Sequence, residues 1–568
     1  MSHINKKINR RTFVKGVAVA SAFASGLGSL EAKNIQPSIN KKHDLYGTEF
    51  HLVISKIAVN FTGTPAIATT INGQIPAPTL HFKEGETVTI HVYNDLDVDS
   101  SIHWHGIILP TNMDGVPNIS FEGIKPKESF TYTFTIKQSG TYWYHSHSGF
   151  QEQTGVYGAI VIEPKVKDPY SYDRDYVVAL SDWSDEKPES IYRKLKLMGD
   201  YYNFNQRTLD DFFSEAKEEG FFSALSKRKM WNQMRMSDRD LSDVTGYTYT
   251  YLMNGHTPNS HYKAPFKKGE KIRLRFINAS AMTFFDVRIP NLKMTVVATD
   301  GNNINPVNVD EFRMGVAETY DVIVEPKDEK AYAIFAQSFD RSGYAIGSLT
   351  SNSTIASTPP MDEVPRLTHV DMGMDMSKMR GMDMKKDSKM KMPMKKKIPI
   401  TPLPEARGVQ TTMRVKNPQY RLSDAGAGLR NNGRRVLTYA DLKSLDGVVD
   451  TKTPQREIIL RLTGNMERYM WSINGIKYSD SKPLQFHYGE RLRITYINDT
   501  MMNHPMHLHG MWSDLETGDG KLVRKHTIVV QPASKISMQV TVDAKGEWAY
   551  HCHLLYHMGG MFRKVVVS

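Results

Sequence analysis

The segment Phe82-Lys83-Glu84-Gly85-Glu86-Thr87-Val88-Thr89-Ile90-His91-Val92-Tyr93-Asn94 decides the fold, because its pattern occurs three times along the 568-residue chain. The second copy begins at Phe266-Lys267-Lys268-Gly269-Glu270 and ends at Asn278, and the third begins at Phe486-His487-Tyr488-Gly489-Glu490 and ends at Asn498. Apolar residues alternate within each copy, and an alternation with period two predicts a half-buried strand.

An Asn-Gly pair precedes each copy, at 72–73, 254–255 and 474–475. Asn-Gly favours the tight turns that join neighbouring antiparallel strands. A unit repeated at this scale usually means a repeated structural element. The sequence therefore predicts three β-sandwich domains of similar plan, rather than a helical bundle.

The residues that follow the three copies differ. The first is followed by His103-Trp104-His105-Gly106, and the third by His504-Pro505-Met506-His507-Leu508-His509-Gly510. The first domain closes on His145-Ser146-His147 and the third on His551-Cys552-His553. The middle domain has Ala281–Asp286 and Tyr332–Gln337 at the same places, without histidine.

Four His-x-His pairs thus lie in matching places of the outer domains. Residues i and i+2 of a strand share one face, so each pair presents two imidazoles to the same side. If the first and third domains pack together, eight imidazoles converge. Zinc rarely takes more than four ligands per ion, whereas imidazole suits copper. The pattern therefore predicts a cluster of three copper ions.

Cys552 is the only cysteine of the chain, and His557 follows it by five residues. One thiolate with two imidazoles is the ligand set of a blue-copper site. Neighbouring side chains of a strand point to opposite faces, so Cys552 and its flanking histidines look opposite ways. The run predicts an electron-accepting copper joined to the cluster through one residue.

The first 32 residues predict an exported protein. Asn9-Arg10-Arg11-Thr12-Phe13-Val14-Lys15 precedes a short, mildly apolar run, which is typical of a cleaved signal and resembles a twin-arginine signal. We therefore expect export to the periplasm by the twin-arginine machinery, with no membrane span. The net charge is +11, but residues 371–397 alone carry nine basic residues and four aspartates. We expect no nucleic-acid partner.

Two segments lie outside the sandwich plan. Residues 184–244 predict a helical insert in the second domain. The segment 359–400 has nine methionines between positions 372 and 394, among many lysines and few other apolar residues, which predicts a disordered linker. Thioethers are soft ligands that select Cu(I), so this linker is a candidate for copper capture.

These motifs together resemble the multicopper oxidases, and within that family the bacterial copper-resistance (CopA-like) group. The resemblance implies an all-β chain of three cupredoxin-like Greek-key β-sandwich domains, at 45–165, 170–358 and 401–568. It implies four copper ions per chain: one type 1, one type 2 and two type 3.

The resemblance also implies the role of each residue. His504, Cys552 and His557 would bind the type 1 copper, and His103 and His507 the type 2 copper. The type 3 pair would take His105, His145, His147, His509, His551 and His553. Asp114 matches a carboxylate that similar enzymes use to supply protons.

The axial ligand of the type 1 copper departs from the family pattern. The expected position holds Phe562, while Met561 stands one residue early, after Gly559-Gly560. Met561 is the favoured axial ligand and Phe562 the alternative. Asp499 and Met502, close to His504 in sequence, are candidates for a Cu(I) docking site.

We therefore expect a monomeric periplasmic enzyme that oxidises Cu(I) and reduces O₂ to water, for copper tolerance. Two alternatives use the same residues. One is a general laccase acting on phenols, and the other is a periplasmic copper-sequestering protein without turnover. A two-domain nitrite-reductase-like protein is disfavoured by the three repeats.

Overall fold

The computed structural model describes residues 43–568 except 234–235, 374–397, 448–449 and 519. The predicted export signal and most of the methionine-rich linker therefore lie outside the described residues. In the described part of the chain, no helix is both long and apolar enough to span a membrane.

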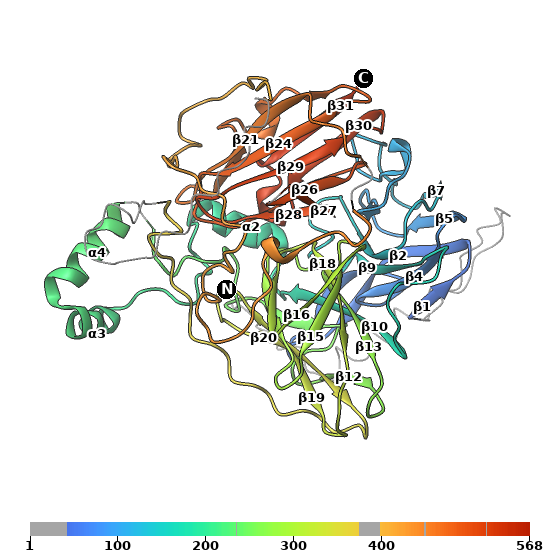
Figure 1. The fold of residues 1–568 in the computed structure, drawn as a ribbon, viewed down its shortest axis with the longest axis horizontal. Coiled ribbons are helices and arrows are strands. Elements are labelled where there is room, and N and C mark those ends of the chain that lie inside the picture. The colour runs from blue at the N-terminus through green and yellow to red at the C-terminus, as the bar shows by residue number, and fades with distance from the viewer. Residues whose placement is uncertain (1–42, 234–235, 374–397, 448–449, 519) are drawn as a thin grey trace, which may run out of the picture. The chain divides into compact units, whose positions relative to one another are not determined.

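The first sandwich consists of two sheets, drawn in blue to cyan in Figure 1. One has the order β1-β4-β9-β8-β6 and the other β3-β2-β5-β7. Their bounds are β1 (Asp44–Tyr46), β2 (Glu49–Val59), β3 (Ala66–Ile71), β4 (Ala77–Lys83), β5 (Thr87–Asn94), β6 (His103–His105), β7 (Ser129–Thr135), β8 (Gly140–His145) and β9 (Tyr157–Glu163). The short 3-10 helix η1 (Thr111–Met113) follows β6.

The second sandwich pairs β11-β10-β13-β18-β15-β16 with β12-β20-β19-β14-β17. Its strands are β10 (Arg174–Trp183), β11 (Thr250–Met253), β12 (Tyr262–Pro265), β13 (Ile272–Asn278), β14 (Phe285–Arg288), β15 (Met294–Thr299), β16 (Asn302–Val309), β17 (Glu311–Met314), β18 (Thr319–Val324), β19 (Tyr332–Ser338) and β20 (Tyr344–Thr350).

The third sandwich, in orange to red, pairs β22-β21-β24-β29-β26-β27 with β23-β31-β30-β25-β28 (Figure 1). Its strands are β21 (Arg456–Asn465), β22 (Met470–Ile473), β23 (Leu484–Phe486), β24 (Arg491–Asn498), β25 (His504–Leu508), β26 (Ser513–Gly518), β27 (Lys521–Lys525), β28 (Thr527–Val530), β29 (Lys535–Thr541), β30 (Gly546–Cys552) and β31 (Phe562–Val567). Short 3-10 turns are η3 (Tyr439–Asp441), η4 (Tyr478–Asp480) and η5 (Leu555–His557).

The three repeated segments form equivalent strands, β5, β13 and β24, and each pairs in parallel with the first long strand of its domain. The predicted all-β fold is therefore confirmed. The terminal asparagines explain the repeat. Asn94 donates to two carbonyl oxygens across the loop that leads to the next strand, at 2.8 Å each, and accepts from the backbone of Leu96.

Asn278 and Asn498 make the same three hydrogen bonds in their own domains. A buried side chain that satisfies three backbone groups fixes the path of a loop. We call these three residues the asparagine staples. Each staple sets the place from which the following strand starts.

The Asn-Gly pairs form the expected tight turns. Asn72, Asn254 and Asn474 have φ between 49° and 53°, and the glycines after them have φ between 71° and 75°. Positive φ at both central residues is the requirement of a type I′ turn. Each asparagine also accepts a backbone N–H, from Val53, Ala179 and Arg461 respectively.

The helical insert lies between β10 and β11, as the sequence predicts. It contains α2 (Pro188–Leu197), α3 (Leu209–Glu219) and α4 (Phe221–Gln233). Figure 1 shows α3 and α4 standing off from the sheets, whereas α2 lies against the third sandwich. Lys196 on α2 donates to the carbonyl oxygen of Tyr469, at 2.6 Å. The insert therefore reaches the third sandwich beside His557, which contacts the ring of Tyr469.

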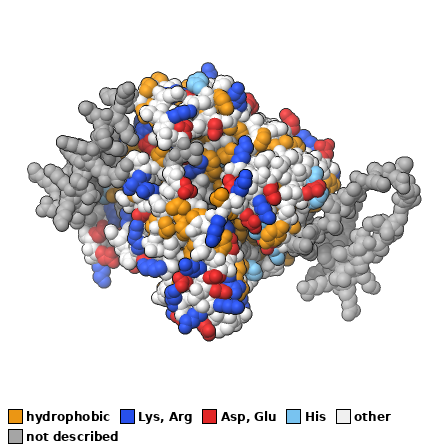
Figure 2. All heavy atoms as spheres, turned by 45° about the vertical axis from the view of Figure 1, so that its right-hand side comes forward, with side chains coloured by type: hydrophobic (Ala, Val, Ile, Leu, Met, Phe, Trp, Pro, Cys, Tyr) orange, Lys and Arg blue, Asp and Glu red, His pale blue; other side chains and the backbone are white. Residues whose placement is uncertain are grey.

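The first sandwich has its own apolar core around Trp104, whereas one continuous core runs through the second and third. The first and third sandwiches also meet directly, because the Thr111 hydroxyl donates to the carbonyl oxygen of Glu547 at 2.8 Å. On the face in Figure 2, basic and acidic side chains are interspersed.

Candidate metal centre

The four His-x-His pairs lie on, or run just past the ends of, strands that pair with each other within their domains. In the first sandwich β6 pairs with β8, so that His103 lies opposite His145. In the third, β25 pairs with β30, so that His507 lies opposite His551. Because residues i and i+2 share a face, each strand pair directs four imidazoles to one side. Those two sides meet where the first and third sandwiches touch.

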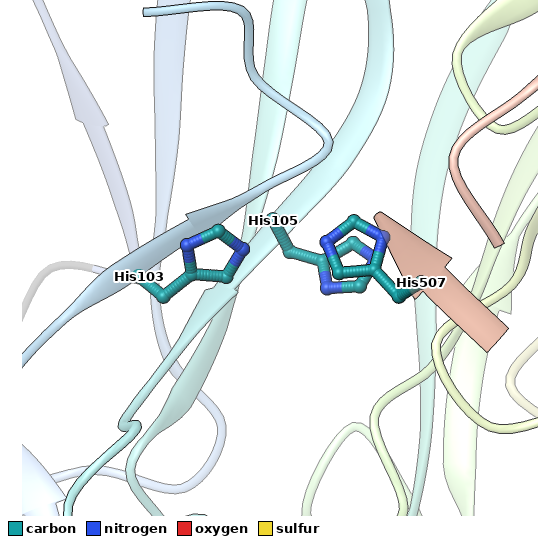
Figure 3. Close-up of side chains that lie close together, drawn as sticks. All are labelled: His103, His105 and His507. Atoms are coloured by element: carbon teal, nitrogen blue, oxygen red, sulfur yellow. The ribbon is translucent and has the colours of Figure 1, made fainter. Parts of the chain in front are cut away.

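The eight histidines come together, and we call this set the imidazole centre. Their ring nitrogens form three groups within 4.8 Å of each other: His103, His105 and His507; His105, His145 and His553; and His147, His509 and His551. Figure 3 shows the first group, with rings from the two sandwiches turned toward one another. The rings of His105 and His507 stack at 3.8 Å between centroids. Each group contains residues of both sandwiches.

Hydrogen bonds at one ring nitrogen fix the orientation of most of these imidazoles. Nδ1–H of His103 donates to the carbonyl oxygen of Asp114 at 2.8 Å, and that of His507 to the carbonyl oxygen of His526 at 2.6 Å. In both residues Nε2 is buried without a hydrogen-bond partner. The anchored nitrogen holds the proton, so the free one presents a lone pair, which is the usual arrangement of a metal-binding histidine.

His509 and His551 give the sharpest test of fit for a cation. Nδ1 of His509 donates to the carboxylate of Asp114 at 2.9 Å, and Nδ1 of His551 donates to the carbonyl oxygen of Cys552 at 3.0 Å. Their Nε2 atoms are then both lone-pair donors, yet they lie 3.0 Å apart. Burial lowers the pKa of His551 to about 4 and that of His509 well below its ordinary value.

A shared proton therefore does not explain the short separation of these two nitrogens, and a bound cation does. Two nitrogens each about 2.0 Å from one tetrahedral ion would be roughly 3.3 Å apart. The Nε2 atoms of His145 and His553 are likewise close, at 3.3 Å. The imidazole centre is thus chemically suited to hold metal ions.

Asp114 lies at the edge of this centre and is 1% exposed. One carboxylate oxygen accepts from His509, and the other is buried without a hydrogen-bond partner. Gly115 allows the close approach: its φ is +79°, and a Cβ there would lie 1.8 Å from the carbonyl oxygen of Ile102. The structure places the predicted carboxylate against two predicted ligands, His103 and His509.

Cys552 lies in a second group with His504 and His557, and we call this the sulfur group. The Cys552 Sγ is 3.6 Å from Nδ1 of His504 and 3.8 Å from Nδ1 of His557, and these two nitrogens are 3.4 Å apart. All three side chains are buried. Burial raises the pKa of the Cys552 thiol, so a thiolate here requires a cation.

The outer nitrogens of the sulfur group are anchored like those of the imidazole centre. Nε2 of His504 lies 2.7 Å from the hydroxyl of Thr500, and Nε2–H of His557 donates to Asp243 at 2.6 Å. The ring of Trp471 stacks on His557 at 3.9 Å. Both Nδ1 atoms therefore face the sulfur.

Met561 and Phe562 lie on different sides of this region. The ring of Phe562 stacks on His551 of the imidazole centre, at 5.4 Å and an interplanar angle of 11°. Met561 is fully buried; its carbonyl accepts from the Cys552 N–H, and its own N–H donates to His557. A Cβ on Gly560 would lie 1.9 Å from the carbonyl oxygen of Trp471, so glycine permits this tight path. The geometry favours Met561 over Phe562 beside the sulfur group.

The structure does not bring Asp499 and Met502 into one docking site. Both carboxylate oxygens of Asp499 accept from Arg461 at 2.6 Å, and one also accepts from the Val415 N–H. Met502 lines a separate, nearly filled cavity of about 10 Å³ beside Asp243. The two residues are close in sequence but leave the chain in different directions.

Family models described as multicopper oxidase match residues 53–167, 174–356 and 451–568. These matches cover more than half of the chain. The chain belongs to the multicopper oxidase family. This oxidase is 52% identical to "Copper resistance protein A" of Escherichia coli, over 99% of each chain. It is 53% identical, over 99% of each chain, to a "Copper resistance protein A homolog" of Pseudomonas syringae pv. tomato.

A similar fold occurs in the solved structure of Fet3p, a multicopper oxidase. The two chains share 17% identity with a TM-score of 0.64, over 92% of this oxidase and 91% of Fet3p. The family and the full-length relatives establish a copper-dependent oxidoreductase of the copper-resistance group, and its cofactor is copper. The lone pairs of the imidazole centre and the thiol of the sulfur group fit that metal.

Four residues around the two groups were not predicted from the sequence. Glu152 accepts from Nδ1 of His145 at 2.8 Å, and Asp243 accepts from His557. Thr500 contacts His504, and Nδ1 of His526 lies 3.1 Å from Nε2 of His105. Burial raises the pKa of Asp243 to about 7, partly offset by the hydroxyl of Tyr469, which donates to it. No motif marks these residues, because each approaches from a distant segment or a loop.

Proposed function

We propose that this oxidase takes electrons one at a time from Cu(I) and uses them to reduce O₂ to water. Four Cu(I) and four protons would be consumed with each O₂, giving four Cu(II) and two waters. With copper bound, the sulfur group would accept single electrons and the imidazole centre would carry out the four-electron reduction of O₂.

One observation carries this proposal: the two groups are distinct but share one short run of chain. Cys552 belongs to the sulfur group, while His551 and His553 belong to different parts of the imidazole centre. Electrons that pass from the sulfur group to the imidazole centre would therefore travel through the covalent bonds of residues 551–553. A storage protein would have no need for two different ligand sets linked in this way.

We assign His504, Cys552 and His557, with Met561, to one type 1 copper. His103 and His507 would hold a type 2 copper, and the remaining six histidines a type 3 pair, which makes four ions per chain. Asp114 orients His509 through its carboxylate and His103 through its carbonyl. Its second oxygen, which has no hydrogen-bond partner, is placed to take up and release protons toward the site of O₂ reduction.

The substrate assignment rests on chemistry and on the relatives. Full-length relatives at 50–53% identity are described as copper resistance proteins. Oxidation of Cu(I) in the periplasm would remove the more membrane-permeable form. The Arg10-Arg11 run supports export by the twin-arginine route, and a chain that carries both halves of the cluster supports a monomer.

The test is a comparison of two substrates with the purified, copper-loaded enzyme. We expect Cu(I) to be oxidised faster than a dimethoxyphenol in buffer without added copper, with one O₂ consumed per four Cu(I). Equal or faster phenol turnover would favour a general laccase. Copper binding without O₂ consumption would favour a sequestering protein.

A further inference from the structure

A separate group of possible metal ligands lies on the outer face of the first sandwich. It consists of Glu49 and His51 on β2 and His91 on β5, whose ligand atoms lie within 4.8 Å of one another. The two strands lie side by side and pair in parallel, with His51 and His91 as partners (Figure 1). Their sheet, β3-β2-β5-β7, carries none of the predicted copper ligands. We call this set the surface triad.

We propose that the surface triad binds one Cu(II) ion in exchange with solvent. This inference goes beyond the proposed function, because no step of Cu(I) oxidation or O₂ reduction uses these three residues. The site is therefore expected to add to the copper that the chain binds without taking part in turnover.

The strands place the triad on one rigid, solvent-facing surface. Phe50 and Leu52 are buried on β2, and Ile90 and Val92 are buried on β5. Side chains alternate between the two faces of a strand, so the residues between these four point outward. Positions i and i+2 of β2 share that face, and the pairing with β5 adds the third member.

The distances within the triad fit one bound ion. Oε1 of Glu49 lies 3.2 Å from Nε2 of His91 and 3.9 Å from Nε2 of His51. With bonds of about 2.0 Å, two ligand atoms of one ion lie roughly 2.8–4.0 Å apart as their angle widens from 90° to 180°. The two imidazole rings stack with their centroids 4.8 Å apart. The His51 side chain is 58% exposed, so its ring can turn toward an ion held by the other two.

Thr131 on β7 orients the His91 ring. Its hydroxyl lies 3.0 Å from Nδ1 of His91, and an outer nitrogen anchored in this way leaves the other nitrogen for an ion. A simple hydrogen bond between His91 and Glu49 would account for two members of the triad. A bound ion accounts for all three, including His51, whose Nε2 approaches the same carboxylate oxygen beyond hydrogen-bonding distance.

The same strand pair in the other two sandwiches carries no imidazoles. The positions equivalent to the paired histidines are Val177 and Arg275 in the second sandwich, and Ile459 and Thr495 in the third. Neither pair can hold a metal ion. The strand pairing therefore does not require histidine here, and the first sandwich alone presents these ligands.

The ligand set selects Cu(II). Among the ion pairs of the described residues, Glu49 pairs with no lysine or arginine, whereas Arg461 neutralises Asp499. Two imidazoles and a carboxylate suit the tetragonal nitrogen and oxygen coordination of Cu(II), with water in the remaining positions. Cu(II) also binds such ligands more tightly than the other divalent first-row ions. Cu(I) prefers sulfur ligands, and the triad contains none.

The test measures added Cu(II) on the full-length, copper-loaded enzyme, after dialysis against a chelator until its copper content is constant. Equilibrium dialysis against Cu(II) then compares the wild type with H51Q/H91Q. A matched control, H81Q/H487Q, removes two imidazoles elsewhere on the first and third sandwiches. We expect H51Q/H91Q to bind one Cu(II) fewer per chain than the wild type, and the control to bind the same number.

Two further measurements identify the ligands and the ion. E49Q keeps both imidazoles and should weaken binding of the added Cu(II) by about tenfold, a typical effect of removing one partner from a metal site. Crystals soaked in Cu(II) should show an anomalous peak between the three side chains. Zn(II) at an equal concentration should leave the bound Cu(II) in place, and its displacement by Zn(II) would overturn the assignment to copper.

Activity separates this site from the proposed function. We expect O₂ consumption and the blue absorption of H51Q/H91Q to match those of the wild type, because the triad makes no contact with either copper group. Equal Cu(II) binding by the wild type and H51Q/H91Q would overturn the proposal. An equal loss in the control would show non-specific binding, and loss of the blue absorption in H51Q/H91Q would show a structural role; either result would also overturn it.

Discussion

The third and middle sandwiches share the same loop-closing asparagine, but only the third has candidate metal ligands after it. Asn498 and Asn278 close equivalent loops with the same three hydrogen bonds. After Asn498 the chain enters the strand that carries His504 and His507. After Asn278 the chain forms a turn, and the backbone N–H groups of this turn donate to Asp182. The repeated elements therefore specify the fold, and the residues added after the staple specify the chemistry.

The loop after Asn278 in the middle sandwich supports His557, a predicted ligand in the third sandwich. The Leu555 N–H donates to the carbonyl oxygen of Ala281 at 3.0 Å, and the Tyr556 N–H lies 3.5 Å from the sulfur of Met282. These contacts hold η5, which ends at His557. The domain without ligands of its own thus helps to position the sulfur group.

We expect the largest effect from a change that removes the sulfur group and leaves the imidazole centre intact. Replacing Cys552 with serine removes the only thiol, so we expect the blue absorption and substrate oxidation to be lost and the copper content to fall by one per chain. The imidazole centre uses none of the Cys552 side chain and should keep its copper. Metal analysis with EPR spectroscopy measures this, and loss of all copper would show that the two groups are not independent.

Asp114→Asn should affect the imidazole centre alone. Partners that hydrogen-bond to metal ligands typically contribute about 10- to 100-fold to activity or metal affinity, so we expect a fall of that size in O₂ consumption. The blue absorption should be unchanged, because Asp114 makes no contact with the sulfur group among the described interactions. A changed blue band would contradict the separation.

Asn498→Ala and Asn278→Ala compare the two staples directly. Asn278→Ala removes three buried hydrogen bonds and Asn498→Ala removes four, and we expect each to lower the free energy of unfolding by roughly 1–3 kcal/mol. Denaturant unfolding measures the cost. Asn498→Ala should alter the blue absorption more than Asn278→Ala, because Thr500 and His504 lie in the loop of Asn498, whereas the loop of Asn278 reaches His557 only through η5; equal spectral changes in both variants would contradict the distinction.

Met561→Leu and Phe562→Leu compare the two candidates for the axial ligand of the type 1 copper, and we expect the smallest effects here. Removing a weak thioether donor destabilises Cu(II) more than Cu(I), so we expect Met561→Leu to raise the reduction potential of the type 1 copper. Phe562 stacks on His551, and its replacement should leave that potential nearly unchanged. Redox titration of the blue absorption compares the two, and a larger shift for Phe562→Leu would reverse the assignment.

Much of the centre could be predicted because its residues lie in short, regular motifs. The His-x-His spacing combined with strand geometry places two imidazoles on one face, and the repeated Gly-to-Asn spacing reveals the three domains. The alternation around Cys552 also predicts that it faces away from His551 and His553. The groups found in the structure agree with each of these inferences.

The rest could not be predicted because it depends on contacts between distant segments. Asp243 reaches His557 from the end of the helical insert, and Glu152 reaches His145 from an irregular loop. Asp499 was a candidate Cu(I) ligand in the sequence, but Arg461 of β21 pairs with its carboxylate just past the end of β24. Met236 and Met413 share a cavity with Met466 although no spacing links them.

Anomalous diffraction at the copper edge, on crystals of the copper-loaded protein, tests the central claim most directly. We expect four peaks per chain: one between Cys552, His504 and His557, and three among the eight imidazoles where the first and third sandwiches meet. Absence of copper from either group, or imidazole-centre peaks bound by histidines of one sandwich alone, would contradict it.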